Sequence, residues 1–269
     1  MIHAKKSLGQ NFLHDQGVLN RIADLSAPEA GSGLIEIGPG TGNLTAHLLE
    51  RLPADWPLDA IERDRRMIPL LAERFGDRVR VTEADAADVD WPALLEPLGP
   101  RPVVVGNLPY YAALPILFAV LEAKPARMVF MVQKEVAERL VAKPSTPAQG
   151  QISVKIQMAA DIRLAFKVGS GAFTPAPNVD SAIIVLQPLA TPRYPICDAK
   201  RFSALVTAGF SLRRKTLVNA LGNALRIPGE TVRAALTAMA VDERIRAEAL
   251  TLPQWAALSL HLASDFSVG

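Results

Sequence analysis

An alternation of strand-like and helix-like segments runs through the first two thirds of this 269-residue chain. The strand-like segments are apolar and short, and the helix-like segments between them have an apolar residue every three or four positions. Strands are expected at 33–37, 58–61, 79–83, 103–106 and 127–133, and helices at about 42–51 and 65–75. Parallel strands need such crossovers, so the order predicts an α/β fold, a parallel sheet with helices on both faces.

The last third of the chain has a different pattern. Strands at 162–168 and 181–187 are expected to close the sheet, and residues 173–177 (FTPAP) between them predict a stiff loop that cannot join a sheet ladder. Residues 198–263 show only helical spacing. We therefore expect two domains, an α/β domain over residues 1–190 and a small all-helical domain over residues 191–269.

Composition and charge narrow the class of protein. Hydrophobic residues make up 49% and charged residues 21%, a globular composition. A single cysteine, Cys197, excludes an internal disulfide framework and a Cys-based zinc site, and the four histidines are scattered, so no metal site is expected. Residues 190–269 hold ten Lys or Arg against six Asp or Glu. This basic balance suggests an anionic partner, and a solvated helix surface is the alternative.

The sequence gives no sign of membrane insertion. Residues 1–10 lack the apolar core of a signal peptide and the Arg-rich pattern of a transit peptide. The uncharged stretch 102–121 is interrupted by Gly106, Pro109 and Pro115. In lipid such interruptions would leave backbone groups unsatisfied. We therefore expect a cytoplasmic protein that does not contact a membrane.

A glycine loop, Gly38-Pro39-Gly40-Thr41-Gly42, connects the first strand to its helix. Such glycines let a ligand approach the backbone, and they can adopt φ values closed to other residues. A dinucleotide-binding loop would have its third glycine at position 43, which is Asn43. The spacing favours a ligand without a pyrophosphate, and S-adenosylmethionine is the leading candidate.

Carboxylates stand at the ends of the next two strands. Glu62 ends the second strand, where it can accept hydrogen bonds from both ribose hydroxyls of a nucleoside, and Asp85 follows the third, where it can accept from an adenine amine. Either one alone would more often be a solvated loop residue. Their positions at successive strand ends, after a glycine loop, favour cofactor binding.

The pentapeptide Asn107-Leu108-Pro109-Tyr110-Tyr111 follows the strand 103–106. An asparagine pairs with the donor edge of adenine, Pro109 restricts the turn, and Tyr110 can stack on a base removed from its neighbours. If the Asn107 oxygen and the Leu108 carbonyl accept from an adenine amine, they aim its lone pair at a methyl donor. An ordinary turn with a core tyrosine is the alternative.

The chain resembles the ribosomal small-subunit RNA adenine dimethyltransferase family over nearly its whole length. The matching segments occur in that family's order, at 6–13, 36–42, 61–62, 85, 107–110, 133–139, 173–181 and 210–217. The resemblance implies a Rossmann-like S-adenosylmethionine-dependent methyltransferase sheet followed by a helical RNA-binding and ribosome-binding domain. It also implies dimethylation of the exocyclic amines of two adjacent adenosines near the 3′ end of small-subunit rRNA, and a role in small-subunit biogenesis.

The resemblance also implies roles for individual residues. The cofactor site would be formed by Gln10, Asn11, Leu13, Glu36, Gly38, Gly40, Gly42, Glu62, Asp85 and Asn107. Asn11 and Leu13 would close over the cofactor, and Asn107 would touch both cofactor and substrate. The catalytic segment would be Asn107, Leu108, Pro109 and Tyr110, with Phe173 on the second face of the target base. A phenylalanine beside a proline-braced loop is equally consistent with core packing.

Cations of the last domain are the candidates for RNA binding. They are Arg213, Arg214 and Lys215, expected at the start of a helix, and Lys200 and Arg201 one helix earlier. Adjacent cations point around a helix, so at least one should be a solvated surface residue. Such contacts reach phosphates and carry no base specificity. The expected partners are the small ribosomal subunit and its rRNA, without DNA, and the absence of a heptad pattern favours a monomer.

Two segments depart from the family pattern. Before the proline at position 115, the family usually has an aliphatic residue followed by small hydroxyl residues. This chain has Ala112, Ala113 and Leu114 there. If Pro115 starts a helix, Leu114 is a cap without a side-chain acceptor, a loss of about 1 kcal/mol. The loop 143–150 lacks the family's usual aromatic residue.

Two other functions compete with this interpretation. One is a large-subunit rRNA adenine methyltransferase of the macrolide-resistance type, against which the FTPAP loop and its Asp180-Ser181 continuation argue. The other is a largely non-catalytic ribosome-assembly factor, against which the intact Gly38, Glu62, Asp85 and Asn107 argue.

Overall fold

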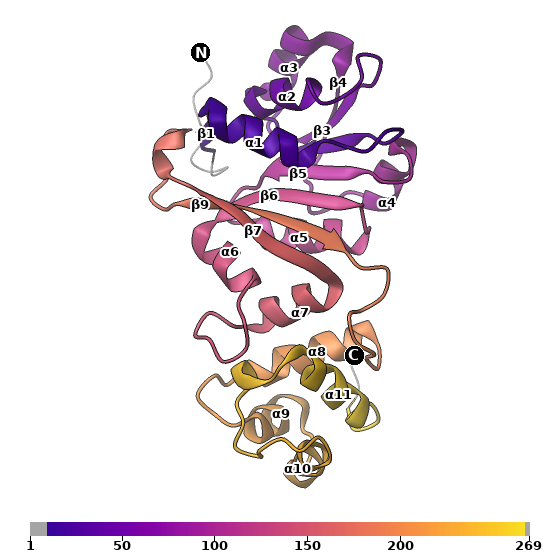
Figure 1. The fold of residues 1–269 in the computed structure, drawn as a ribbon, viewed down its shortest axis with the longest axis vertical. Helices are drawn as coiled ribbons and strands as arrows, with labels where there is room; N and C mark the ends of the chain where they lie inside the picture. Colours follow the sequence, from indigo (N-terminus) through magenta and orange to yellow (C-terminus); the bar gives the residue numbers. More distant parts are fainter. Residues whose placement is uncertain (1–9, 267–269) are drawn as a thin grey trace. The chain divides into compact units, whose positions relative to one another are not determined.

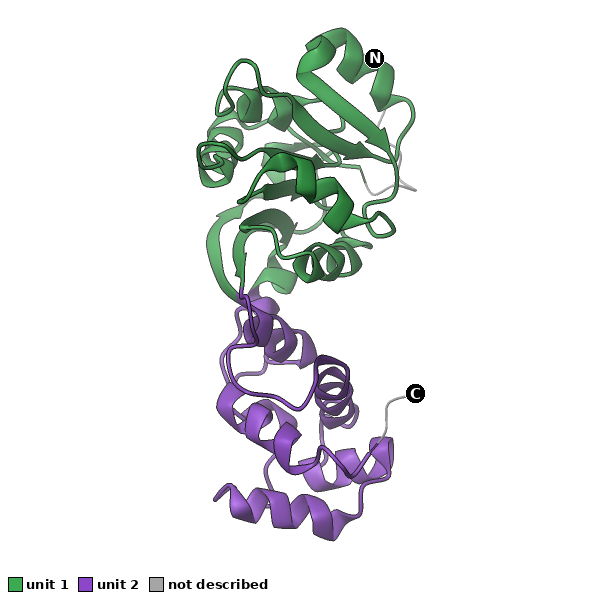
Figure 2. Cartoon of the chain, turned by 90° about the vertical axis from the view of Figure 1, so that its right-hand side faces the viewer, with its two compact units in different colours: residues 1–137, 161–188 green, residues 138–160, 189–269 purple. Residues whose placement is uncertain are grey.

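The computed structural model describes residues 10–266 and divides them into two compact units, coloured in Figure 2. The first unit takes the described residues up to Ala137 together with Asp161–Pro188. The second takes Glu138–Ala160 and the residues from Leu189 onward. Figure 1 follows the helices and strands along the chain.

The first unit is built on a seven-stranded sheet with the order β4-β3-β2-β5-β6-β9-β7. The five strands from β4 to β6 in this order are mutually parallel, and β9 is antiparallel to β6. The strands are β4 (Val79–Glu83), β3 (Leu58–Glu62), β2 (Leu34–Ile37), β5 (Val103–Asn107), β6 (Arg127–Gln133), β9 (Ser181–Pro188) and β7 (Ala160–Val168). The predicted α/β sheet is therefore confirmed.

The direction of strand succession reverses beside β2. Strands β3 and β4 lie on one side of β2, whereas β5 and β6 lie on the other. Ile37 of β2 pairs with Gly106 of β5, so the carboxyl ends of these two strands reach the same level. Such a reversal leaves a crevice outside the strand ends, which is where open α/β sheets bind ligands.

The helices of the first unit are α1 (Gln16–Ser26), α2 (Asn43–Leu49), α3 (Met67–Phe75), α4 (Trp91–Leu95) and α5 (Ala113–Glu122). Helix α6 (Lys134–Leu140) begins in this unit and ends in the second. Strands β2, β5 and β6 are almost wholly buried, as expected of parallel strands covered on both faces. The helices predicted at 42–51 and 65–75 are present, with ends that differ by at most two residues.

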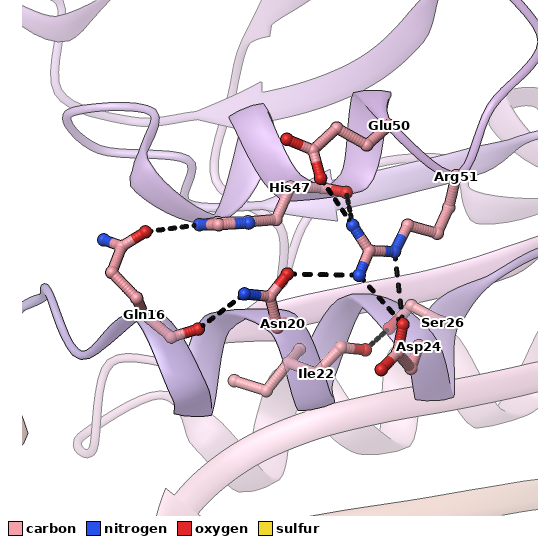
Figure 3. Close-up of polar contacts among 8 residues, drawn as sticks. All are labelled: Gln16, Asn20, Ile22, Asp24, Ser26, His47, Glu50 and Arg51. Carbon is pink, nitrogen blue, oxygen red and sulfur yellow. Dashed lines mark hydrogen bonds and ion pairs between the residues drawn. The ribbon is translucent and has the colours of Figure 1, made fainter.

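Polar side chains link α1 to α2 (Figure 3). Nη2 of Arg51, beyond the end of α2, donates to Asp24 Oδ1 at 2.9 Å and to Asn20 Oδ1 at 3.1 Å. His47 Nε2 lies 3.0 Å from Gln16 Oε1. Because the Asp24 side chain is 67% exposed, its ion pair contributes at most about 1 kcal/mol. Leu19, Ile22 and Ala23 of α1 are buried in the apolar core of the first unit, so α1 is also held by apolar packing.

A second, two-stranded sheet corrects the interpretation of residues 173–177. Strand β1 (Phe12–Leu13) pairs antiparallel with β8 (Phe173–Thr174). The two paired residues of β8 precede Pro175 and keep their backbone N–H groups, so they can join a ladder that the prolines then end. The predicted exclusion of the whole segment from any ladder is wrong.

The second unit is helical. Its helices are α7 (Gln151–Ala159), α8 (Ala199–Gly209), α9 (Leu217–Leu225), α10 (Gly229–Ala238) and α11 (Leu252–His261). Trp255 of α11 is fully buried and stacks on Phe210 with ring centroids 5.8 Å apart. None of the helices between residues 10 and 266 combines the length and the low charge that a membrane span requires.

The sequence pattern predicts one boundary between the two domains, at residue 190, whereas the structure divides the chain differently. The chain crosses between the units after Ala137, after Ala160 and after Pro188. Val154 and Met158 of α7 are buried in the apolar core of the helical unit, which explains why residues 138–160 group with it. The sequence places these residues in the α/β domain because they lie between two of its strands.

Gly106 provides a test of the close packing at the reversal point. A Cβ atom there would lie 2.8 Å from the Ile37 carbonyl oxygen and 2.9 Å from Ile37 Cβ. Because both atoms belong to a central strand and cannot move aside, Gly106→Ala should lower the free energy of unfolding by about 1 to 3 kcal/mol. Gly169→Ala is the control, since a Cβ there meets nothing within 4 Å. Equal urea midpoints for the two variants would contradict this packing.

Candidate functional site

A cavity opens at the carboxyl ends of the central strands, where the strand order reverses. Its lining comes from residues 10–13, the glycine loop, the segments after β3 and β4, and residues 107–112. Nine of the ten predicted cofactor residues line it: Gln10, Asn11, Leu13, Glu36, Gly38, Gly40, Glu62, Asp85 and Asn107. The structure thus brings together residues that are far apart in the chain. Residues 6–9 of the first family motif lie outside the described residues.

The tenth residue, Gly42, has a packing role. It caps α2 with φ +82°, and a Cβ there would lie 2.5 Å from Phe75 Cε2. Gly42 therefore lets the glycine loop pack against α3, and it does not line the cavity. Gly40 also has a positive φ, and a Cβ there would lie 3.2 Å from the Phe12 ring. The loop and the amino-terminal segment can approach closely only with glycine at position 40.

The Glu62 carboxylate is held by the backbone on both sides. Oε2 accepts from Gly40 N at 3.0 Å and Oε1 accepts from Asp64 N at 2.7 Å. Burial raises the pKa of Glu62, and these hydrogen bonds oppose the rise. A carboxylate has about four acceptor positions, so it retains capacity for ligand hydroxyls.

Glu36 lies deeper, at 1% exposure. Its Oε2 accepts from Thr45 Oγ1 at 2.6 Å. Burial raises the pKa of Glu36 to about 8, the Thr45 hydroxyl opposes the rise, and the neighbouring Glu62 adds to it. Because desolvation disfavours a buried carboxylate, a cationic ligand in the cavity would favour its ionised form.

Asp85 is already paired with a cation. Its Oδ2 accepts from Arg63 Nη1 at 2.9 Å, and Oδ1 accepts from Ala87 N at 3.0 Å. Arg63 also donates to the Tyr111 hydroxyl at 3.2 Å. An amine that binds to Asp85 would have to share this carboxylate with Arg63.

Asp64 is a site residue that the sequence does not identify. It is 4% exposed, and Oδ2 accepts from Arg66 Nη2 at 2.6 Å and from Gln10 Nε2 at 2.9 Å. Hydrogen bonds from Arg66 hold the pKa of Asp64 well below its usual range. The only signal in the sequence is a second acid two positions after Glu62, which by itself is typical of a surface loop.

The predicted catalytic segment lies at the cavity wall. Asn107, Leu108, Pro109 and Tyr110 all line the cavity. The Tyr110 hydroxyl lies 2.8 Å from the hydroxyl of Ser181, which is fully buried, so the ring is tied to β9. The sequence shows Ser181 only as part of a motif and does not reveal this contact.

Phe173 is not brought together with this segment. Its side chain is 3% exposed, packs in the apolar core of the first unit and does not line the cavity. In the pairing of β8 with β1, Phe173 lies opposite Leu13. Of the two interpretations of Phe173, core packing describes its position in this structure.

The helix after the catalytic segment also begins earlier than expected. Helix α5 starts at Ala113 with Ala112 as its N-cap, so Leu114 is not the cap. Ala112 provides no side-chain acceptor either. The Pro109 carbonyl accepts from Ala112 N at 3.0 Å and closes the turn instead.

The five candidate RNA-binding cations lie in the second unit. Arg213, Arg214 and Lys215 are exposed and occupy the turn between α8 and α9. The predicted helix start at these residues is wrong, because Thr216 caps α9 and the helix begins at Leu217. Arg213 Nη2 donates to the Pro147 carbonyl at 3.1 Å, which ties the turn to the loop 143–150.

The other two cations begin α8. Lys200 is exposed, whereas Arg201 is partly buried. Arg201 pairs with Asp198 at 3.6 Å and donates to the Ala263 carbonyl. Arg201 therefore has a structural role within the helical unit, and Lys200 remains the more accessible of the two.

Comparisons with known proteins agree with one another. A model of the family described as "Ribosomal RNA adenine dimethylase" matches residues 1–264. A protein of Anaeromyxobacter sp. (strain K) named "Ribosomal RNA small subunit methyltransferase A" is 46% identical over 267 residues, covering 96% of this chain and 93% of the relative. A Pseudomonas aeruginosa protein of the same name is 42% identical over 264 residues, covering 97% and 95%.

Two solved structures are also similar. The 23S rRNA methyltransferase ErmE has a TM-score of 0.70 at 26% identity, covering 94% of this chain and 100% of that one. A dimethyladenosine transferase from Plasmodium falciparum has a TM-score of 0.75 at 23% identity, covering 94% and 98%. At this identity the second likeness shows the fold alone.

The raised pKa of Glu36 predicts a pH dependence of stability. Between about pH 4.5 and pH 8 the folded protein keeps a proton that the unfolded chain loses, so the free energy of unfolding should fall as the pH rises. We expect a fall of about 1 to 4 kcal/mol across this window. Glu36→Gln keeps an acceptor for Thr45 but cannot titrate. The free energy of unfolding of this variant should therefore lack the fall that Glu36 causes in the parent protein. Denaturant titrations of both proteins at several pH values would measure this, and parallel curves would contradict it.

Proposed function

Because the chain belongs to the ribosomal RNA adenine dimethylase family, it is an rRNA adenine dimethyltransferase of the small ribosomal subunit, and we propose that it acts on two adjacent adenosines near the 3′ end of that rRNA. The observation that carries the proposal is a single cavity. It joins the glycine loop, Glu62 and Asp85 to the Asn107–Tyr110 segment at the reversal of strand order.

S-adenosylmethionine is the cofactor that the family implies, and the cavity suits it. When bound, it supplies a methyl group activated by a sulfonium cation. The lining includes the carboxylates of Glu36, Glu62 and Asp85, which favour a cationic ligand that also carries hydroxyls and an amine. In this proposal Glu62 accepts from the ribose hydroxyls, Asp85 from the adenine amine, and Gly38 lets the ligand approach the end of β2.

Asn107 and Leu108 prepare the target amine. The exocyclic nitrogen of adenine is a weak nucleophile because its lone pair is delocalised into the ring. Two acceptors, the Asn107 side-chain oxygen and the Leu108 carbonyl, favour a more tetrahedral nitrogen with its lone pair directed at the methyl group. They also stabilise the positive charge that develops on nitrogen, so no strong general base is needed before transfer.

Tyr110 holds one face of the target base in this proposal. Its hydroxyl contact with Ser181 restrains the ring, so less rotamer freedom is lost when a base stacks on it. Phe173 contributes to the site indirectly in this proposal, because its strand β8 pairs with β1, which contains the cavity residue Leu13. A direct stacking role for Phe173 would require its side chain to leave the core.

The helical unit contacts the ribosomal substrate in this proposal. Its exposed turn of Arg213, Arg214 and Lys215, with Lys200, suits phosphate contacts that position the subunit without reading sequence. The protein acts in the cytoplasm as a monomer, on RNA and not on DNA. In this proposal the modification is part of small-subunit biogenesis.

Large-subunit methylation is the alternative that a specific observation addresses. ErmE, a 23S rRNA methyltransferase, shares 26% identity with this chain, whereas the small-subunit relatives named above share 42% and 46%. The higher identities favour the small subunit. A purely non-catalytic assembly role is disfavoured because Gly38, Glu62, Asp85 and Asn107 all line the cavity. The test is incubation of the protein with labelled cofactor and unmodified small or large subunits, followed by mapping of the labelled nucleotides. We expect label on two adjacent adenosines near the 3′ end of the small-subunit rRNA, and label at other nucleotides would contradict the proposal.

Asn107→Ala tests the proposed chemical step. Because the contribution of the Asn107 oxygen grows as charge develops on the amine, the variant should lower single-turnover methylation by about 10²-fold while subunit affinity changes little. Asn20→Ala, on α1 outside the cavity, is the control and should turn over like the parent. Parental turnover by folded Asn107→Ala on saturating small subunits would reject the mechanism, even with the family assignment intact.

A charge-matched pair of triple variants tests the RNA-binding turn. Neutralising Arg213, Arg214 and Lys215 should weaken small-subunit binding and flatten its dependence on salt, because fewer counterions are released. The control neutralises three other exposed cations of the same unit, Arg233, Arg244 and Arg246. Binding titrations at several salt concentrations would show the effect. Equal losses in both triples would mean that net charge alone matters, and the turn would have no special role.

A further inference from the structure

The segment of residues 10–14 is here called the strap; its residues 10–13 line the cavity, and hydrogen bonds hold it at several positions. Gln10 Nε2 donates to Asp64 at 2.9 Å. The Asn11 carbonyl accepts from Asn107 Nδ2 at 3.2 Å, and the Leu13 carbonyl accepts from Asn43 Nδ2 at 2.8 Å. The backbone of Phe12 and Leu13 pairs with β8. The strap is therefore fixed from several different elements of the sheet domain.

One of these contacts sets the orientation of the Asn107 amide. A backbone carbonyl can only accept a hydrogen bond, so the group facing Asn11 O has to be the Asn107 NH2. The Asn107 oxygen must then point away from the strap. Among residues 10–266 this oxygen has no protein donor, and Asn107 lines the cavity. A strap that moved away would leave the amide able to rotate and offer a donor in place of an acceptor.

The first anchor of the strap is stiff. Asp64 is buried, and Arg66 contacts both of its oxygens, with Nε at 3.0 Å from Oδ1 and Nη2 at 2.6 Å from Oδ2. A bidentate arginine fixes the plane of a carboxylate. The same Oδ2 receives Gln10, so the start of the strap is positioned by an ion pair on the loop after β3. The charged state of Asp64 is stabilised by these partners.

We propose that Asp64 and Asn43 are positioning residues for methyl transfer, because they hold the strap where the Asn11 carbonyl orients the Asn107 amide. The inference rests on the proposed role of Asn107. In this proposal Asn43 holds the strap through the Leu13 carbonyl, two residues after Asn11. The strap then does more than cover the cofactor, since it links closure of the cavity to the acceptor for the target amine.

A reciprocal swap tests the Asp64 anchor. Gln10→Glu removes the donor to Asp64 and places a second carboxylate beside it, so that Arg66, whose Nη2 lies 3.4 Å from Gln10 Oε1, is shared between the two acids. The variant should slow single-turnover methylation about tenfold at saturating cofactor and saturating unmodified small subunits. Adding Asp64→Asn restores a hydrogen bond in the reverse direction, from the new amide at position 64 to the new carboxylate at position 10, and should recover most of the rate. A role limited to covering the cofactor would change the calorimetric cofactor affinity and leave the saturated rate parental, which would overturn the proposal.

Asn43→Asp is the second variant. It loses the donor to Leu13 O, but an acid in the first turn of α2 suits the helix dipole, so folding should be retained. We expect a loss of about tenfold in the parent and little further loss in an Asn107→Ala background, because both changes act on one acceptor. Additive losses, or parental rates for Asn43→Asp and for Gln10→Glu, would overturn the proposal. Parental turnover of Asn107→Ala alone would instead reject the proposed role of Asn107, so the two failures are distinguishable.

Discussion

The site depends on the buried carboxylate of Glu62, which joins two loops of the sheet. By accepting from Gly40 N and Asp64 N, it ties the glycine loop after β2 to the loop after β3. Burial alone would favour the protonated form, and the two N–H donors offset that cost. The group proposed to bind the ribose therefore also sets the backbone of both walls. Loss of this carboxylate would disturb the site before any ligand arrives.

Strand order explains why distant motifs meet. Residues 38 and 107 are far apart in the chain, yet residue 38 follows β2 and residue 107 ends the neighbouring strand β5. The two strand ends are level, as the pairing of Ile37 with Gly106 shows. The glycine at position 106 allows the close approach of β5 to β2. The proposed cofactor loop and the proposed acceptor of the target amine are therefore adjacent because of the topology, and no long side chain is needed to connect them.

The sequence predicts the features of this site that depend on local pattern. Strand ends, the glycine loop and residues such as Asn107 are visible because periodicity and turn chemistry act over a few positions. The role of Asp64 cannot be predicted from local pattern, since its hydrogen-bond partner Gln10 lies 54 positions earlier in the chain. The burial of Phe173 depends likewise on the pairing of β8 with β1. The assignment of residues 138–160 to the helical unit depends on packing that spacing cannot reveal.

The two units differ in charge in a way that suits two kinds of ligand. The cavity lining of the first unit includes four carboxyl groups, those of Glu36, Glu62, Asp64 and Asp85, and one cation, Arg63, which is paired with Asp85. The second unit instead exposes a turn of three adjacent cations. An acidic cavity favours a cationic cofactor and opposes phosphate groups. A base removed from its stack is uncharged, so it can enter such a cavity while its phosphates stay outside. Under the proposed function, the acidic lining admits the nucleobase and excludes the RNA backbone, and phosphate contacts are left to the basic turn.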